Sequence, residues 1–444
     1  MPRNLRRLIL PLFLCVFFTL TYVIVAFWPV QQRLTVGEVL SVPKAFPEFL
    51  RNYLVLTTNG RYPGMGDCIS LGERVKAPVP GRFQARLALH GIIPIRTIVF
   101  DVQPVRRVYP GGQAVGVLLH TQGVIIVGYA EVFTKNGAKS SPAAEAGIMV
   151  GDIILSVDGK PAASDQAVKD AVLRAGGEQR PVVIAVERRG KKMHFKVRPV
   201  FCRRSESYRI GLLIRDSAAG VGTLTFYDPV TRTYGALGHV VTDVTTASPV
   251  ELTEGSIIEA FIQGVRPGQK GKPGEKVGII SEASTLSGTI QQNTEYGIFG
   301  RLDRIPKHPF YQEPIPVALA HQVRPGKATI LTVVQGSRME HFQIEILRVN
   351  PLNRGGKKDI IIKVTDQRLL RSAGGIIQGM SGSPIIQAGR LVGAVTHVYI
   401  NNPRKGYGIF AERMLRECNL LSSRNKERVF LSNSYPSTKA CCKI

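Results

Sequence analysis

Acidic residues and tryptophan are scarce in this chain. Its 444 residues include 32 Asp and Glu against 58 Lys and Arg, and there is a single Trp. The formal net charge of +26 predicts a surface that attracts anions. Zinc-finger spacing and the aromatic-basic pattern of RNA-binding domains are both missing, so nucleic acid is not the expected partner. An anionic membrane surface explains the charge better.

Cysteine is also sparse, and its spacing excludes two kinds of site. The six cysteines form no CxxC pair and no Cys/His ligand pattern, so neither a structural zinc site nor any other metal or cofactor is expected. None of them lies in a pattern typical of a catalytic thiol. Long helical periodicity is rare too, whereas glycine and proline are plentiful. The composition and length therefore predict a mainly β protein with two or three domains.

The N-terminus contains the one long apolar run. Arg3, Arg6 and Arg7 precede the apolar residues 8–30, which are numerous enough to cross a bilayer. We expect residues 1–30 to form a single-pass anchor with a cytoplasmic N-terminus, and the remainder of the chain to be extracytoplasmic. A cleaved signal peptide is the alternative, but the run is long for one and lacks an Ala-x-Ala site.

After a predicted linker and small β-rich segment at 31–105, residues 106–200 have the pattern of a PDZ domain. A short helix with a serine cap is expected at 141–147, a strand ending in an Asp-Gly turn at 150–159, and an amphipathic helix at 165–174. PDZ domains bind extended peptides by adding a strand to their sheet. The predicted peptide-binding segment is glycine-rich and comprises Gly112, Ala114, Val115, Gly116 and Val117. An ordinary glycine-rich hairpin is the alternative.

Residues 205–421 are rich in short strands separated by turn residues, which predicts a barrel or double barrel. Within them, Gly379–Pro384 reads Gly-Met-Ser-Gly-Ser-Pro, and we call it the nucleophile loop. A serine hydroxyl attacks a carbonyl only when a base takes its proton and N–H donors receive the oxyanion. Flanking glycines allow the backbone to approach a substrate closely, although a plain turn between strands would have a similar composition. The polar tail at 422–444 receives no assignment.

His239 is the candidate base. It follows a small-residue turn and enters a β-branched run, and the pKa of histidine suits proton transfer at neutral pH. A histidine that merely ends a strand would give the same local pattern. If the nucleophile loop folds as in chymotrypsin-like peptidases, the N–H groups of Gly379 and Ser381 would form the oxyanion hole.

Together, Gly-His-Val-Val-Thr-Asp at 238–243 and the nucleophile loop resemble the stage IV sporulation protein B family of endospore-forming bacteria, from the N-terminus to about Leu421. These proteins are membrane-anchored serine peptidases with a PDZ domain. The resemblance implies a chymotrypsin-like double β-barrel, with Ser381 as nucleophile, His239 as base and Asp366 as the third member of the triad. Asp243, four residues after the histidine, is the rival for the third role.

The resemblance also implies a function. Family members act in the space between the two membranes of the forespore, where they cleave the regulatory subunit of the membrane-embedded complex that processes pro-sigma-K, and cleave themselves near the N-terminus. The alternative is a non-catalytic PDZ scaffold whose peptidase-like domain only binds peptides. The presence of both His239 and Ser381 in intact loops favours the peptidase.

Overall fold

The computed structural model describes residues 11, 13, 15, 16, 19, 30–39, 53–58, 68–70, 76–77, 79–134, 139–242, 249–250, 252–280, 286–351 and 358–421. The chain divides after Arg106 into two compact units, the second of which runs from Arg107 to Leu421. Most of the predicted anchor, Asp243 and the polar tail lie outside the described residues. Among the residues that were described, no helix is both long and apolar enough to span a bilayer.

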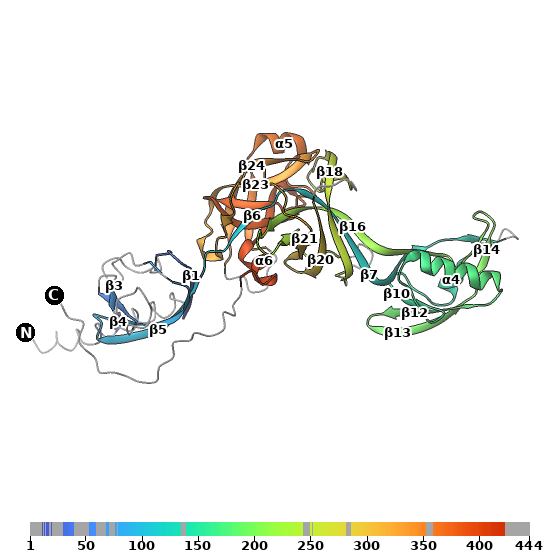
Figure 1. Cartoon of the computed structure of the whole chain (residues 1–444), viewed down its shortest axis with the longest axis horizontal. Helices are drawn as coiled ribbons and strands as arrows, with labels where there is room; N and C mark the ends of the chain where they lie inside the picture. Colours follow the sequence, from blue (N-terminus) through green and yellow to red (C-terminus); the bar gives the residue numbers. More distant parts are fainter. Residues whose placement is uncertain are drawn as a thin grey trace, which may run out of the picture. The chain divides into compact units, whose positions relative to one another are not determined.

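The first unit contains a five-stranded sheet, drawn in blue in Figure 1. Its strands lie in the order β1-β5-β4-β2-β3 and comprise β1 (Gln31–Thr35), β2 (Leu54–Thr57), β3 (Cys68–Ser70), β4 (Gly81–Leu89) and β5 (Ile93–Gln103). Alternate residues of the β4–β5 hairpin point to one face, so Leu87, Ile98 and Phe100 form its core. This sheet lies in the range predicted to be β-rich.

The PDZ fold begins the second unit. Its main elements are α3 (Pro142–Glu145), β10 (Ile153–Val157), β11 (Lys160–Pro161), α4 (Asp165–Gly177), β12 (Val182–Arg188) and β13 (Lys191–Val197). Ser164 caps α4 by accepting a hydrogen bond from the N–H of Ala167, and the helix runs three residues past its predicted end. Ser141 precedes α3 but does not cap it, because its hydroxyl donates to the Gly211 carbonyl instead.

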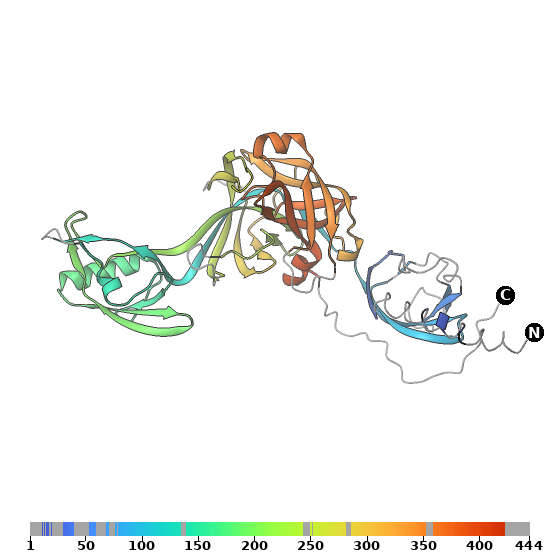
Figure 2. The ribbon, with the colours of Figure 1, turned by 180° about the vertical axis from the view of Figure 1, so that it is seen from behind.

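Two long strands, β7 and β16, connect the PDZ fold to a ring of strands, and Figures 1 and 2 show these two strands side by side. Successive pairings join β7 (Ala114–Tyr129), β18 (Leu252–Arg266), β20 (Ser287–Thr294), β21 (Gly297–Leu302), β17 (Thr233–Ala236) and β16 (Leu212–Tyr227), which pairs again with β7. The far half of β7 pairs with β10 of the PDZ fold. The PDZ fold is therefore inserted between β7 and β16.

The strand pairing of β7 contradicts the predicted role of Gly112 and of Ala114 to Val117 in peptide binding. From Ala114 to Val117, strand β7 pairs with β16 on one side, and from Val115 to Val117 it also pairs with β18 on the other. The N–H of Gly112 donates to the Leu224 carbonyl. The segment is therefore an interior strand of the ring, with no free edge to which a peptide strand can add.

The second half of the unit is a closed barrel in the order β23-β24-β25-β28-β27-β26. Its elements are β23 (Gly326–Gln335), β24 (Arg338–Val349), β25 (Ile360–Val364), α5 (Gln367–Ala373), β26 (Pro384–Gln387), β27 (Arg390–Tyr399), β28 (Asn402–Phe410) and α6 (Ala411–Glu417). Strands β26 and β27 lie on either side of Ala388-Gly389. Both turn residues have positive φ, as a two-residue hairpin turn requires.

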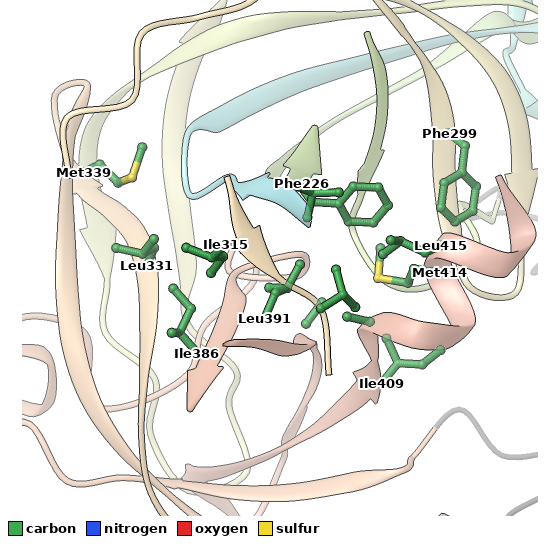
Figure 3. Close-up of a cluster of buried hydrophobic side chains, with 14 of the residues drawn as sticks. Phe226, Phe299, Ile315, Leu331, Met339, Ile386, Leu391, Ile409, Met414 and Leu415 are labelled. Carbon is green, nitrogen blue, oxygen red and sulfur yellow. The ribbon is translucent and has the colours of Figure 1, made fainter. Parts of the chain in front are cut away.

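One apolar core joins the ring to the barrel, as Figure 3 shows. Phe226 and Phe299 enter it from the ring, while Leu331, Ile386 and Leu391 enter it from the barrel. Burial of each such side chain stabilises the fold by about 2 kcal/mol. This shared core holds the ring and the barrel, which carry the two predicted catalytic segments, in one compact unit.

The remaining short elements complete the unit. They are β6 (Arg107–Pro110), β8 (Val132–Phe133), β9 (Lys139–Ser140), β14 (Val200–Cys202), β15 (Ser207–Arg209), β19 (Glu275–Ile280), β22 (Ile315–Pro316) and the 3-10 helix η1 (Ala320–Gln322). Among them, β19 pairs with β18 and runs beside the nucleophile loop through the bridge between Glu275 and Gln378.

Candidate active site

The nucleophile loop lies against strand β16 and is held there by Thr223. The Thr223 N–H donates to the Ser381 carbonyl at 2.9 Å, and the Thr223 hydroxyl donates to the Gly379 carbonyl at 2.8 Å. Inside the barrel, the Gly382 N–H donates to the Val395 carbonyl at 2.8 Å. The loop is therefore fixed from both the ring and the barrel.

Two glycines of the loop have conformations that other residues rarely adopt. Gly379 has a φ of 90° and Gly382 a φ of 93°. A Cβ at position 382 would lie 2.0 Å from the Thr223 carbonyl oxygen and 2.5 Å from the Leu237 nitrogen. The glycines are thus needed both for the turn itself and for close packing against the ring.

The loop leaves two N–H groups available. The Met380 N–H donates to the Ile377 carbonyl just before the loop, and the Ser383 N–H donates to the Met380 carbonyl. By contrast, the N–H groups of Gly379 and Ser381 have no hydrogen-bond acceptor in the part of the chain that the structure describes. These are the two donors expected of an oxyanion hole, and a buried N–H without a partner is uncommon outside functional sites.

Ser381 is only half-buried, in a loop that is otherwise mostly buried. Its hydroxyl donates a hydrogen bond to the Thr396 carbonyl on β27 at 2.7 Å. In this arrangement the proton of Ser381 is held by the backbone. Attack on a substrate requires the hydroxyl to leave this carbonyl for a base.

His239 follows β17 of the ring and lies beside β27. Its ring centroid is 5.1 Å from that of His397, the residue after Thr396. The Nδ1 atom is 2.9 Å from the Val240 carbonyl oxygen, and a carbonyl can only accept, so we assign the proton to Nδ1. The basic nitrogen is then Nε2. The structure thus brings the predicted base and the nucleophile to the same strand of the barrel.

Asp366 has partners other than His239. It is the N-cap of α5, where its carboxylate accepts from the N–H groups of Arg368 and Gln343 and from the Arg368 guanidinium. Burial alone would raise its pKa, but the bonds from Arg368 and Gln343 outweigh burial and lower it. All hydrogen bonds of this carboxylate go to these two residues.

Lys276 is a residue of the site that the sequence analysis missed. It lies on β19 directly behind the nucleophile loop, with its side-chain carbons against Gly379. Its amine is 2.8 Å from the Thr332 hydroxyl and 3.3 Å from the Thr223 hydroxyl. Burial lowers the pKa of Lys276 to about 7. A lysine in a strand is ordinarily solvated, so nothing in the local sequence marks it.

In the described ranges, no three His, Cys, Asp or Glu side chains gather closely enough to hold an ion. Cys202 is a free thiol in the same ranges.

A ring and a closed barrel that share a core, a glycine-bounded serine with two available N–H donors and an inserted PDZ fold define a PDZ-containing serine peptidase. Comparison with known families agrees with this class. The model described as SpoIVB peptidase S55 matches residues 206–415, and a PDZ domain model matches residues 115–198. Residues 206–415 thus match the SpoIVB peptidase S55 family, and together with the PDZ match the chain is consistent with a PDZ-containing serine peptidase of that family.

Solved structures similar to this chain include peptidases and an isolated PDZ domain. The active form of the Rv3671c protease from M. tuberculosis is 14% identical, with 46% of this chain and 74% of that one covered and a TM-score of 0.25. The HtrA-type protease AlgW with a decapeptide is 11% identical, covering 47% and 53%, with a TM-score of 0.26. The PDZ domain of an SdrC-like protein from Listeria monocytogenes is 20% identical, covering 21% and 87%, with a TM-score of 0.17. No curated protein matches the chain.

Two glycine substitutions test the packing of the nucleophile loop. Gly382→Ala places a methyl group against the Thr223 carbonyl, so we expect loss of fluorophosphonate labelling and a destabilisation of more than about 3 kcal/mol. Gly389→Ala is the matched control, because its φ of 71° is also positive but no atom lies within 4 Å of the new Cβ. It should cost about 1 kcal/mol and keep labelling. Equal effects in thermal unfolding and labelling would contradict this account.

Proposed function

We propose that Ser381 is the nucleophile and His239 the general base of this peptidase. The observation that carries the proposal is the geometry of the nucleophile loop. It presents a serine hydroxyl in the same loop as two unbonded N–H groups. This hydroxyl bonds to β27, the strand whose His397 also contacts the histidine. These are the parts that acyl transfer by a serine requires.

In the proposed reaction, the Ser381 hydroxyl exchanges the Thr396 carbonyl for Nε2 of His239. Its oxygen then attacks the scissile carbonyl while the imidazole takes the proton. The oxyanion that forms is stabilised by the N–H groups of Gly379 and Ser381. The imidazolium gives its proton to the leaving amine, and water hydrolyses the acyl-enzyme by the reverse sequence.

The Val240 carbonyl supports this assignment of the base. By accepting from Nδ1, it holds the tautomer in which Nε2 carries a lone pair. A carboxylate at Nδ1 would in addition stabilise the imidazolium. Asp366, indicated by the resemblance, and Asp243, outside the described residues, remain the two candidates for that further role.

For the biological setting, we propose a membrane-anchored signalling peptidase of sporulation. The support is the match of residues 206–415 to the SpoIVB peptidase family and the apolar run at 8–30 with arginines before it. The proposed substrate is the regulatory membrane protein of the pro-sigma-K processing complex, with self-cleavage near the N-terminus. The catalytic unit would then act in the space between the forespore membranes.

Two substitutions test the catalytic assignment. Ser381→Ala and His239→Ala should each lower cleavage of the purified regulatory protein by at least about a thousandfold. Ser381→Ala should also abolish fluorophosphonate labelling. Both side chains are half-buried on loops, so thermal unfolding should change little. Ser372→Ala on α5 is the control and should behave as the wild type does.

Either catalytic variant with near wild-type turnover would remove that residue from the site. Labelling of Ser381 without cleavage of the regulatory protein would keep the nucleophile and reject the proposed substrate.

A third experiment concerns Asp366. Asparagine is also a good N-cap, and the observed partners of Asp366 are Arg368 and Gln343. We therefore expect Asp366→Asn to lower stability by about 1 kcal/mol, through loss of the ion pair, and to keep turnover within about tenfold. A loss of several orders of magnitude in folded protein would instead show that Asp366 orients His239, as the family resemblance implies. Asp243→Asn, measured in parallel, shows whether the rival carboxylate has that role.

A further inference from the structure

Lys276 connects the ring and the barrel through hydroxyl groups. Thr223 belongs to β16 of the ring and Thr332 to β23 of the barrel, and the Lys276 amine contacts both. The side chain is buried, and no carboxylate in the described part of the chain contacts the amine. A buried lysine without an acidic partner is costly as an ammonium ion.

The hydrogen-bond partners fit an uncharged amine. The Thr223 hydroxyl gives its proton to the Gly379 carbonyl, so it must accept from Lys276. The Thr332 hydroxyl has the amine as its only partner among the described residues. A neutral amine has two N–H groups, and the Thr223 and Thr332 oxygens accept both. An ammonium ion has a third N–H, which would have no acceptor among the described residues.

The charged groups around Lys276 do not alter this conclusion. On its own strand the neighbouring acid is Glu275, which is exposed and pairs with Arg266 of β18. The groups that face the amine from β16 and β23 are the two threonine hydroxyls. The nucleophile loop contributes only backbone. Burial is accordingly the cause that lowers the pKa of Lys276 to about 7.

Lys276 holds the peptide groups on both sides of Gly379. Its backbone N–H donates to the Gln378 carbonyl at 2.9 Å, in the same peptide plane as the Gly379 N–H. Its amine, through the Thr223 hydroxyl, fixes the Gly379 carbonyl in the next plane. The orientation of the Gly379 N–H, one of the two proposed oxyanion donors, therefore depends on this lysine.

We propose that Lys276 is a positioning residue of the proteolytic site: as an uncharged amine it links Thr332 to Thr223 and thereby fixes the Gly379 peptide, and protonation disturbs this link by adding a buried charge and a third N–H without an acceptor. The proposal rests on the assignment of Ser381 and Gly379 to the site. Lys276 would then be a second proton-sensitive group of the peptidase, in addition to His239. Acid then inactivates the enzyme in two ways, by protonating the base and by disturbing the oxyanion donors.

The first test observes the lysine itself in the wild-type full-length chain. With lysine labelled by 13C at Cε, one NMR signal should titrate near pH 7, and Lys276→Met should remove that signal. If no lysine signal titrates near pH 7, the proposal is wrong, whatever the activity of the enzyme.

The second test follows the rate of fluorophosphonate labelling of Ser381 from pH 5 to 8. Two inactivating protons should give the wild type a logarithmic slope above one on the acid side. Lys276→Met keeps the size of the side chain but not the link, so it should label about ten- to a hundredfold more slowly at pH 8, with a slope of one. Lys363→Met, at an exposed position of β25, is the matched control.

The outcomes separate the two proposals. If Lys276→Met folds and labels with the wild-type rate and slope, the lysine has no positioning role, while the catalytic assignment stands. Failure of the wild type to label at Ser381 would instead reject the catalytic assignment.

Thermal unfolding provides a readout that does not depend on activity. The folded pKa of Lys276 is about 7 and its ordinary value is 10.5. Between these values the unfolded chain binds more protons, so this residue makes stability rise with pH. Lys276→Met should remove that rise, and an unchanged pH dependence of stability would contradict an uncharged Lys276.

Discussion

Three hydrogen bonds of Thr223 hold the proposed catalytic segments together. Its N–H and hydroxyl donate to the carbonyls of Ser381 and Gly379, and its own carbonyl accepts from the N–H of Leu237, two residues before the histidine. The base and the nucleophile belong to a ring and a barrel that are far apart in sequence. One residue of β16 therefore determines how the turn before His239 meets the nucleophile loop. Glycine at 382 is required because any side chain there would occupy the position of the Thr223 carbonyl.

The same strand also explains how a PDZ fold can be accommodated without disturbing the site. Strands β7 and β16 pair along most of their length, with Ala114 opposite Thr223 at one end and Tyr129 opposite Leu212 at the other. The PDZ fold is inserted at the end far from Thr223. Because every connection to it passes through this paired ribbon, the insertion adds no break to the strands that carry the site. Local unfolding of the PDZ fold would leave the Thr223 end of the ribbon paired.

Short sequence patterns were sufficient to predict individual strands, a helix and a loop of the fold. Short apolar runs at 385–386 and 391–395 are typical of strands such as β26 and β27, and the positive φ of Ala388 and Gly389 suits the turn between them. The amphipathic spacing of the residues from Asp165 onward marked α4. The glycines around Ser381 marked a loop that needs close backbone approach. Each of these signals lies within about ten residues, where periodicity and turn chemistry are informative.

Features that depend on distant strands were not predictable in this way. Gly112–Val117 resembles an open binding loop, and only the pairings with β16 and β18 show that it is interior. Lys276 lies between Glu275 and Val277 in a short strand, where an exposed lysine would be expected, and its burial follows from the loop that covers it. Asp366 did carry a local signal, since an aspartate before Gln-Arg-Leu-Leu is typical of a helix N-cap. That signal explains its bonds to the first turn of α5.

The position of the Ser381 hydroxyl is compatible with catalysis for an energetic reason. Strand β27 pairs with β28 at Val395 and again at Val398, and the register shifts between them, at Thr396 and His397. The Thr396 carbonyl lies in this irregular part and accepts the serine proton. Exchanging such a hydrogen bond for one to an imidazole costs about 1 kcal/mol or less, because one bond replaces another. Serine-peptidase catalysis lowers barriers by about ten times as much, so the rotation is a minor cost. The backbone around Gly379 is different, because two N–H groups without partners are fixed before substrate arrives. Donors that are already oriented need no reorganisation when charge develops, and this makes the rigidity behind the loop, at Thr223 and Lys276, the more important contribution of the fold.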